Sequence, residues 1–356
     1  MSGSPMIGQN ARQHDGNAPP RTDLVAVTGA TGFVGSHLVE HLLQEGYAVR
    51  AIVRPTSDTR WLASRDVPWR VVDWEVPASL VRAVEGCRYV FHLAAVTAAP
   101  RRSDYERANT TYCAHLAQAL LACTPPPVLV LCSSIAAAGP ARRSCRLSDP
   151  APAPVSHYGR SKRGGELAAA LQADRLAVTI VRPGIVFGPR GRELLPLFRS
   201  IYRFRLHFAP TLRPVPLSWI HVADVAAILL RAATRGRRLV PGSRTGADPG
   251  FYYAVARESV DYPTFGRLVG RALGRPCLAL NVPQPVGWLA AAAADGWAAW
   301  RRTTLPLSVD KMREASCGPW TFDPSALSDE LDYTFPKTLY ERIEETARWY
   351  LESGWL

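Results

Sequence analysis

The chain has 356 residues, of which 47% are hydrophobic and 20% charged, a composition typical of a globular protein with a sizeable core. Its formal net charge is +12, but the basic residues are spread along the chain without a basic helix, which argues against a nucleic-acid-binding protein. No run of about 18 uncharged apolar residues is present, so the sequence indicates no membrane-spanning helix.

Residues 1–22 are polar and contain Gly, Asn and Pro without an apolar segment. We interpret them as a disordered leader and not as a signal peptide. The seven cysteines are scattered, with neither a CxxC pair nor zinc-ligand spacing. This pattern favours free thiols in the reducing cytoplasm and gives no reason to expect a metal site.

The segment that follows alternates β-rich runs with runs of helical period. We expect strands at 24–29, 48–54, 69–74, 89–95, 128–134 and 178–184, and helices at 34–45, 79–85, 104–123 and 156–173. Such alternation predicts an α/β fold: a Rossmann-type, doubly wound parallel sheet with helices on both faces. We therefore assign residues 23–190 to a dinucleotide-binding domain, to which 217–260 return.

After residue 190 the pattern becomes less regular, more helical and richer in Pro and Trp. Residues 191–216 and 261–356 are predicted to form a smaller, mostly helical cap that binds substrate at the carboxyl edge of the sheet. The apolar run 282–302 has two interpretations. It is either a buried helix of the cap or a lip that contacts a membrane surface, with Arg301 and Arg302 on lipid phosphates.

The stretch TGATGFVG (28–35) lies between the first expected strand and the first expected helix. Gly29 permits a tight turn, Gly32 lets the backbone approach a pyrophosphate, and Gly35 lets the helix pack on the strand. The N-terminus of that helix then directs free N–H groups at the phosphates. The GxxGxxG spacing differs from GxGxxG, and a glycine turn without a ligand is the alternative. The predicted contacts are Gly29, Thr31, Gly32, Phe33, Val34 and Gly35.

The second strand ends in Arg54, where an NAD site would place an acidic residue on the ribose hydroxyls. A guanidinium suits a 2′-phosphate, so the sequence favours NADP(H) as cofactor, with NAD as the alternative. The alternative is that Arg54 is a solvent-exposed arginine at a strand end and has no role in cofactor binding. Asp73, at the end of the third strand, is a candidate acceptor for the adenine amino group, and Trp74 completes this part of the predicted site.

The stretch SHYGRSKRGGE (156–166) places Tyr158 and Lys162 four residues apart, on one face of a helix. A nearby ammonium lowers the phenol pKa from about 10 and lets the pair exchange a proton with an alcohol or ketone oxygen. Ser133 and Ser134 end the fifth strand, where a hydroxyl would orient the substrate oxygen. Each motif alone is weak evidence for a catalytic site, but their combination in this order along the chain is more specific.

With these motifs the chain resembles the extended short-chain dehydrogenases/reductases over residues 23–356. The matching stretches are TGATGFVG (28–35), HLAA (92–95), Asn109, SS (133–134), YGRSK (158–162), RPGIVFGPR (182–190) and WIHVADVA (219–226). The resemblance implies Tyr158 as general acid/base, Lys162 as the residue that binds the nicotinamide ribose and lowers the Tyr158 pKa, and Ser134 as the residue that aligns the substrate. It also implies that the cofactor is lined by Leu93, Ala94, Ala95, Ser133, Pro183 and Ile185, and that Asp224 is structural.

The chain most resembles the 3β-hydroxysteroid dehydrogenase-like and dihydroflavonol reductase-like branch, since SSIAAAG (133–139) differs from the SSxxVYG of sugar-nucleotide epimerases. This predicts an NADP(H)-dependent oxidoreductase that interconverts a secondary alcohol and a ketone on a sterol-like or long-chain lipid substrate. The alternatives are a nucleotide-sugar epimerase or dehydratase with tightly held NAD, and an NADP(H)-binding protein without turnover. The resemblance also implies a homodimer through 104–123 and 156–173, in the cytoplasm or at the inner membrane face.

Overall fold

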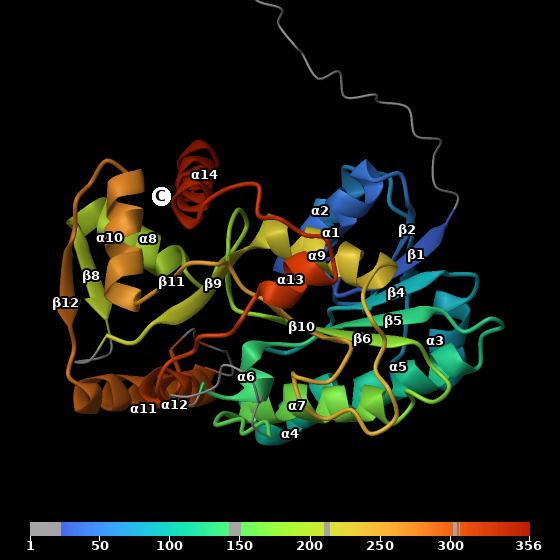
Figure 1. Cartoon of the computed structure of the whole chain (residues 1–356). Coiled ribbons are helices and arrows are strands. Elements are labelled where there is room, and N and C mark those ends of the chain that lie inside the picture. The colour runs from blue at the N-terminus through green and yellow to red at the C-terminus, as the bar shows by residue number, and fades with distance from the viewer. Residues whose placement is uncertain (1–22, 142–150, 210–213, 302–304, 306) are drawn as a thin grey trace, which may run out of the picture.

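The computed structural model describes residues 23–141, 151–209, 214–301, 305 and 307–356, so the expected leader lies outside the described residues. A seven-stranded, fully parallel sheet forms its centre, with the strand order β10-β6-β5-β4-β1-β2-β3 (Figure 1). This confirms the predicted Rossmann-type fold. The strands are β1 (Leu24–Thr28), β2 (Ala48–Val53), β3 (Trp69–Val71), β4 (Tyr89–His92), β5 (Val128–Cys132), β6 (Val178–Pro183) and β10 (Phe251–Ala254).

Helices cover both faces of this sheet, as its two-sided hydrophobic pattern requires (Figure 1). α1 (Phe33–Gln44) and α9 (Val222–Thr234) pack on one face, while α3 (Pro77–Val84), α5 (Tyr112–Leu121) and α7 (His157–Ala170) lie on the other. The expected helix 104–123 is interrupted: α4 (Arg102–Glu106) passes through a π-helical turn, η1 (Arg107–Thr111), into α5. Two short helices, α2 (Arg60–Ala63) and α6 (Ile135–Ala138), are additional.

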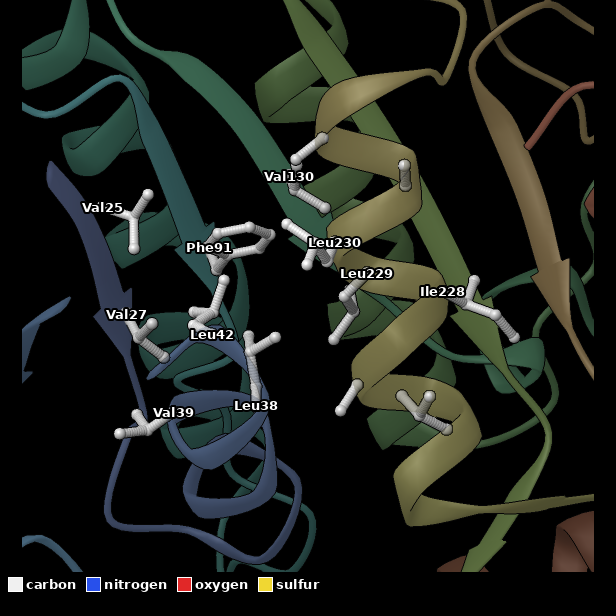
Figure 2. Packing of buried hydrophobic residues seen from close by; sticks show 14 of the residues in the cluster. Val25, Val27, Leu38, Val39, Leu42, Phe91, Val130, Ile228, Leu229 and Leu230 are labelled. Carbon is white, nitrogen blue, oxygen red and sulfur yellow. The ribbon is translucent and has the colours of Figure 1, made fainter. Parts of the chain in front are cut away.

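Side chains alternate between the two faces of the central strands. In β1, Val25 and Val27 join the core under α1 and α9, whereas Ala26 joins the core under α3 and α5. Figure 2 shows the first of these cores, with Leu38 and Leu42 of α1 directed toward Phe91 of the sheet. Each such buried aliphatic side chain contributes about 1.5–3 kcal/mol, so this layer fixes α1, and the turn that precedes it, against the sheet.

The remaining elements form a second body beside the carboxyl edge of the sheet (Figure 1). A three-stranded sheet, β11-β9-β7, and a parallel pair, β12-β8, are surrounded by helices. The bounds are β7 (Ile185–Phe187), β8 (Leu206–Ala209), β9 (Leu217–His221), β11 (Ser259–Val260), β12 (Leu278–Asn281), α8 (Leu195–Phe204), α10 (Tyr262–Ala272), α11 (Gln284–Arg301), α12 (Val309–Ser316) and α14 (Leu339–Glu352). The short helix α13 (Ser325–Asp329) instead packs on the central sheet beside β10.

One buried ion pair joins α9 to α14. The Asp224 carboxylate accepts hydrogen bonds from Arg342 Nε (3.0 Å) and from the Tyr333 hydroxyl (2.7 Å). Both charged side chains are nearly inaccessible to water, so loss of either partner would leave an unpaired buried charge, which costs several kcal/mol. None of the described helices is long and apolar enough to cross a bilayer.

Candidate active site

The glycine-rich turn between β1 and α1 is closed so tightly that side chains are excluded. Gly29 has a φ of +68°, and a Cβ there would lie 2.7 Å from the Ala94 nitrogen. A Cβ on Gly35 would lie 2.1 Å from the Gly29 carbonyl oxygen. Gly32 begins α1 as its N-cap without a capping side chain, which leaves first-turn N–H groups for a ligand. This cradle fits a dinucleotide pyrophosphate.

Thr28 holds the neighbouring HLAA loop in place. Its hydroxyl bonds with His92 Nδ1 (2.8 Å) and accepts the backbone N–H groups of Leu93 (3.2 Å) and Ala94 (3.1 Å). The carboxyl ends of β1 and β4 are thereby tied together. Thr28 and His92 were not predicted as positioning residues, although both lie inside the motifs TGATGFVG and HLAA.

A cavity of about 640 Å³ opens where β1, β4, β5 and β6 end. It gathers most of the predicted site into one space, although the predicted residues that line it extend from Gly29 to Ile185 along the chain. The predicted residues that line it are Gly29, Gly32, Phe33, Val34, Gly35, Leu93, Ala95, Ser133, Ser134, Tyr158, Lys162, Pro183 and Ile185.

Five predicted cofactor residues, Thr31, Arg54, Asp73, Trp74 and Ala94, do not line this cavity. Arg54 and Asp73 are exposed just beyond β2 and β3, at the same edge of the sheet. Trp74 is buried in the core and stacks on Tyr112, with ring centroids 5.4 Å apart. Its side chain therefore packs between the sheet and its helices, which the strand-end position alone did not reveal.

The catalytic candidates are held by the contact between α6 and α7. Ser134 is the N-cap of α6, and its Oγ accepts the Ala136 N–H at 3.1 Å. Gly159 lets α7 approach, because a Cβ there would lie 2.4 Å from the Ala136 carbonyl oxygen. Tyr158 and Ser134 consequently come within hydrogen-bonding reach of each other in the cavity wall.

Lys162 lies one turn after Tyr158 and is buried, with Nζ donating to the Cys132 carbonyl oxygen at 2.8 Å. Burial lowers the pKa of Lys162. The pKa of Tyr158 is raised, first by burial and then by the carboxylates of Glu193 and Glu314, while the hydrogen bond with Ser134 acts in the opposite direction. The Tyr–Lys spacing predicts a lowered pKa for Tyr158, whereas burial of the phenol in this structure raises it.

A buried polar cluster of Glu166 and Arg182 packs next to the serine pair, Ser133 and Ser134. Ser133 donates to Glu166 Oε1 at 2.6 Å, and Arg182 binds both carboxylate oxygens of Glu166 at 2.8 Å. Burial raises the pKa of Glu166, but Arg182 outweighs it and the net shift is downward, so the carboxylate stays charged. The Ser133 hydroxyl is thus committed to Glu166, and that of Ser134 remains the one beside Tyr158.

The second body contributes acidic and basic groups to the same site through α12. Asp310 Oδ1 and Oδ2 accept the backbone N–H groups of His157 (2.7 Å) and Tyr158 (3.1 Å), and Glu314 accepts the Ser156 hydroxyl at 2.6 Å. Lys311 lies over the Tyr158 ring, 5.5 Å from its centroid. These α12 residues were not predicted, because no motif in LSVDKMREAS signals them. Within the described ranges, no three His, Cys, Asp or Glu side chains form a metal-binding cluster.

Comparisons with known proteins identify the family of this chain. The sequence model of the NAD dependent epimerase/dehydratase family matches residues 25–244. A ceramide reductase of Caulobacter vibrioides is 30% identical over 336 residues, covering 94% of this chain and 96% of that protein. A putative dihydroflavonol 4-reductase of Synechocystis is 28% identical over 349 residues, again covering 94% of this chain and 96% of that protein.

Among solved structures, a UDP-glucose 4-epimerase of Thermotoga maritima aligns with a TM-score of 0.74 at 18% identity, covering 93% of this chain and 99% of that one. At this identity the likeness shows the fold alone. The family match spans more than half of the chain and confirms the resemblance drawn from the motifs. The chain therefore belongs to the NAD dependent epimerase/dehydratase family, among the extended short-chain dehydrogenases/reductases, and is an NAD(P)-dependent enzyme.

Proposed function

We propose that this enzyme is an NADP(H)-dependent oxidoreductase that interconverts a ketone and a secondary alcohol on a hydrophobic substrate. The observation that carries the proposal is the arrangement of Ser134, Tyr158 and Lys162 around one cavity that also reaches the glycine turn. Bound NADP(H) would supply or accept the hydride at the carbinol carbon. The protein's own residues would bind the substrate and move the proton.

In the direction of reduction, Tyr158 donates its phenolic proton to the carbonyl oxygen as the carbon becomes tetrahedral. Ser134, within hydrogen-bonding reach of Tyr158, holds that oxygen. Lys162, fixed on the Cys132 carbonyl, binds the nicotinamide ribose and stabilises the phenolate that remains. The pKa of Tyr158 is raised by burial, so the phenol is protonated at neutral pH and holds the proton that reduction consumes.

The cavity wall supports a hydrophobic substrate. Away from the catalytic group it is lined by large apolar side chains of the second body, namely Leu194, Val215, Leu217, Leu307, Met312 and Trp320. A long-chain lipid fits such a lining better than a sugar does, because apolar walls cannot satisfy many hydroxyls. The name of the ceramide reductase relative supports the same class, and we take the keto form of ceramide as the first substrate to test.

Changing Tyr158 to Phe tests the catalytic assignment. The variant lacks the transferable proton, so NADPH consumption with keto-ceramide should fall by roughly 10²–10⁴-fold while NADPH affinity stays nearly unchanged. Tyr105→Phe is the matched control, since that ring lies 6.5 Å from the Tyr158 ring but does not line the cavity. Undiminished turnover in Tyr158→Phe would end the assignment.

The same preparation separates the alternative functions. A nucleotide-sugar epimerase would carry stoichiometric NAD(H) through purification and return the hydride within one turnover. An oxidoreductase consumes added NADPH instead. A protein that binds NADPH but turns over no alcohol or ketone would be a binding protein without catalysis.

We also propose that α11 rests on a lipid surface. Its inward side carries the small buried residues Gly287, Ala291 and Ala298. Its outward side carries large apolar residues at helical spacing, with exposed fractions of 52% for Val286, 71% for Leu289, 52% for Trp297 and 70% for Trp300. The helix is thus apolar on both sides, and the interpretation as a purely buried helix describes only its inward side.

The end of α11 suits the boundary between lipid and water. The Arg301 guanidinium lies 5.1 Å from the centroid of Trp297 and 4.9 Å from that of Trp300. Tryptophan and arginine together are favoured where hydrocarbon meets headgroups. Leu307 follows α11, is partly exposed and lines the cavity, so a lipid would pass from the membrane surface to Tyr158 along this side.

A homodimer through the α4–α5 segment and α7 remains part of the proposal. α5 and α7 pack against each other on one face of the sheet. On the outer side of α7, Leu167 is 40% exposed, and Leu171, which follows the helix, is 77% exposed. Two apolar side chains four residues apart would be covered when two copies pair these helices.

A further inference from the structure

Lys311 places a second ammonium at the active site, from a helix outside the Rossmann body. It lines the cavity, its Nζ lies 5.5 Å from the centroid of the Tyr158 ring, and its side chain is 38% exposed. The catalytic steps proposed above use Lys162 and leave Lys311 without a role.

Lys311 is not needed to dock α12. Asp310 and Glu314, four residues apart on one side of α12, already bind the start of α7 through two backbone N–H groups and the Ser156 hydroxyl. The N-terminus of α12 is capped by Ser308, which accepts the backbone N–H of Lys311 and not its side chain. The long Lys311 side chain is therefore held over Tyr158 by a backbone that other residues fix.

The Lys311 ammonium keeps hydrogen-bonding capacity for a ligand. Its ion pair with Glu314 spans 3.6 Å between Nζ and Oε2, longer than a direct hydrogen bond. An ammonium has three donors, and this one lines the cavity beside the reacting phenol. Burial lowers the pKa of Lys311, but Glu314 and Glu193 outweigh it and the net shift is upward, so the group stays charged at neutral pH.

The local charge selects the kind of acceptor. Two carboxylates, Glu193 and Glu314, act on both Tyr158 and Lys311. They compensate the charge of Lys311, so an anion would gain little by binding there. A neutral oxygen, from an amide carbonyl or a hydroxyl, can accept from Lys311 without meeting repulsion from the carboxylates.

We propose that Lys311 recognises a neutral amide or hydroxyl oxygen that the substrate carries close to its reacting ketone. This inference rests on the proposed function and specifies its substrate: an amphiphilic ketone with a polar group next to the carbonyl and a hydrocarbon body in the apolar part of the cavity. A ketone in a plain hydrocarbon chain would lack the group that Lys311 binds.

Binding of alcohol products to the enzyme saturated with NADPH tests this inference, because no hydride acceptor is then present and no turnover occurs. The ligands are a short-chain ceramide, with an amide and a second hydroxyl beside its secondary alcohol, and a secondary alcohol of equal chain length without these groups. The wild type should bind the ceramide more tightly. Lys311→Met should weaken ceramide binding by roughly 10- to 100-fold, the value of one charge-assisted hydrogen bond, and leave the plain alcohol unaffected.

Two further variants separate recognition from structure. Lys311→Arg keeps the charge and should retain part of the preference for ceramide. Lys337→Met is the control, because Lys337 pairs with Glu345 on the surface and does not line the cavity. A thermal melt of Lys311→Met should match that of the wild type.

Several outcomes would overturn the inference. They are a wild type without preference for ceramide, an equal loss for both ligands in Lys311→Met, and tighter binding of a hydroxy fatty acid than of ceramide. Since binding is measured without turnover, failure of the enzyme to reduce any ketone would refute the proposed function and leave this test intact. Conversely, turnover without selectivity would refute only the role of Lys311.

Discussion

At the scale of single residues, Arg54 is the side chain on which the choice of dinucleotide depends. It is exposed just after β2, and its backbone is held by a hydrogen bond from its N–H to Ser57 Oγ at 3.0 Å. The loop is thus ordered while the guanidinium reaches into solvent at the edge of the sheet. A guanidinium in this position can form a charge-assisted, bidentate contact with a 2′-phosphate, which a 2′-hydroxyl cannot accept.

Arg54→Asp should therefore weaken NADPH binding by roughly 10²-fold, because it removes a charge-assisted hydrogen bond and adds repulsion, while NADH binding changes little. Fluorescence titration with both cofactors measures the two affinities. Arg82→Asp, an exposed charge reversal on α3, is the control for net charge. Equal effects of Arg54→Asp on both cofactors would remove the 2′-phosphate role.

At the scale of elements, the helices of the second body differ in how they use their apolar residues. α8 and α10 bury theirs in a common core with α14, around Phe198, Phe265 and Tyr350. α11 buries small residues and exposes large ones, the reverse of the usual distribution. A helix that packs only against a protein core does not need large apolar residues on its exposed side. We therefore assign the exposed side of α11 to contact with a lipid surface.

Trp297→Ala and Trp300→Ala should each weaken binding to sucrose-loaded vesicles with anionic lipid by roughly tenfold, since each buries about half of an aromatic side chain. Sedimentation measures the bound fraction. Trp69→Ala, a 43% exposed tryptophan on β3, is the matched control and should bind like the wild type. Wild-type protein that stays in the supernatant, or a loss of dimers in the α11 variants, would contradict the membrane role.

At the scale of the whole molecule, stability at acid pH depends on buried histidines. Burial lowers the pKa of His37 from 6.5 to about 4, and those of His92 and His221 from 6.5 to about 3. In the unfolded chain these groups take up protons near pH 6.5, whereas in the folded protein they resist protonation. The stabilisation is therefore fully present above pH 6.5 and is lost as the pH falls toward 3.

Urea unfolding between pH 7 and pH 4 should consequently show a falling free energy of unfolding, by up to about 1.4 kcal/mol per pH unit for each histidine. His221→Asn keeps the N-cap acceptor for the Ala223 N–H but cannot titrate. The free energy of unfolding of this variant should fall less steeply with decreasing pH, by the slope that corresponds to the uptake of about one proton. A slope identical to that of the wild type would show that His221 is not involved.

The assembly state is the second property of the whole molecule that can be tested. Leu171→Glu should place a charge in the proposed dimer contact and yield monomers by multi-angle light scattering, without loss of secondary structure. Leu351→Glu, at a 43% exposed leucine of α14, is the control. Dimers that persist in Leu171→Glu would exclude the contact through α7.

The parallel sheet, the glycine turn and the placement of Tyr158 and Lys162 on one helix face could all be predicted from the sequence. Each depends on local information: strand and helix period, glycines where no Cβ fits, and two residues one helical turn apart. The order of strands brings the ends of β1, β4 and β5 to one edge, so residues distant in the chain meet there without further information.

The remaining features of the site depend on contacts between segments that are distant in the chain. The contact of Asp310 with the start of α7 spans more than 150 residues, and no period marks it. The burial of Trp74, the raised pKa of Tyr158 and the position of Lys311 depend on which side chains surround each group. Desolvation and Coulomb interactions act through space, so a pattern read along the chain fixes which groups exist but not which of them meet.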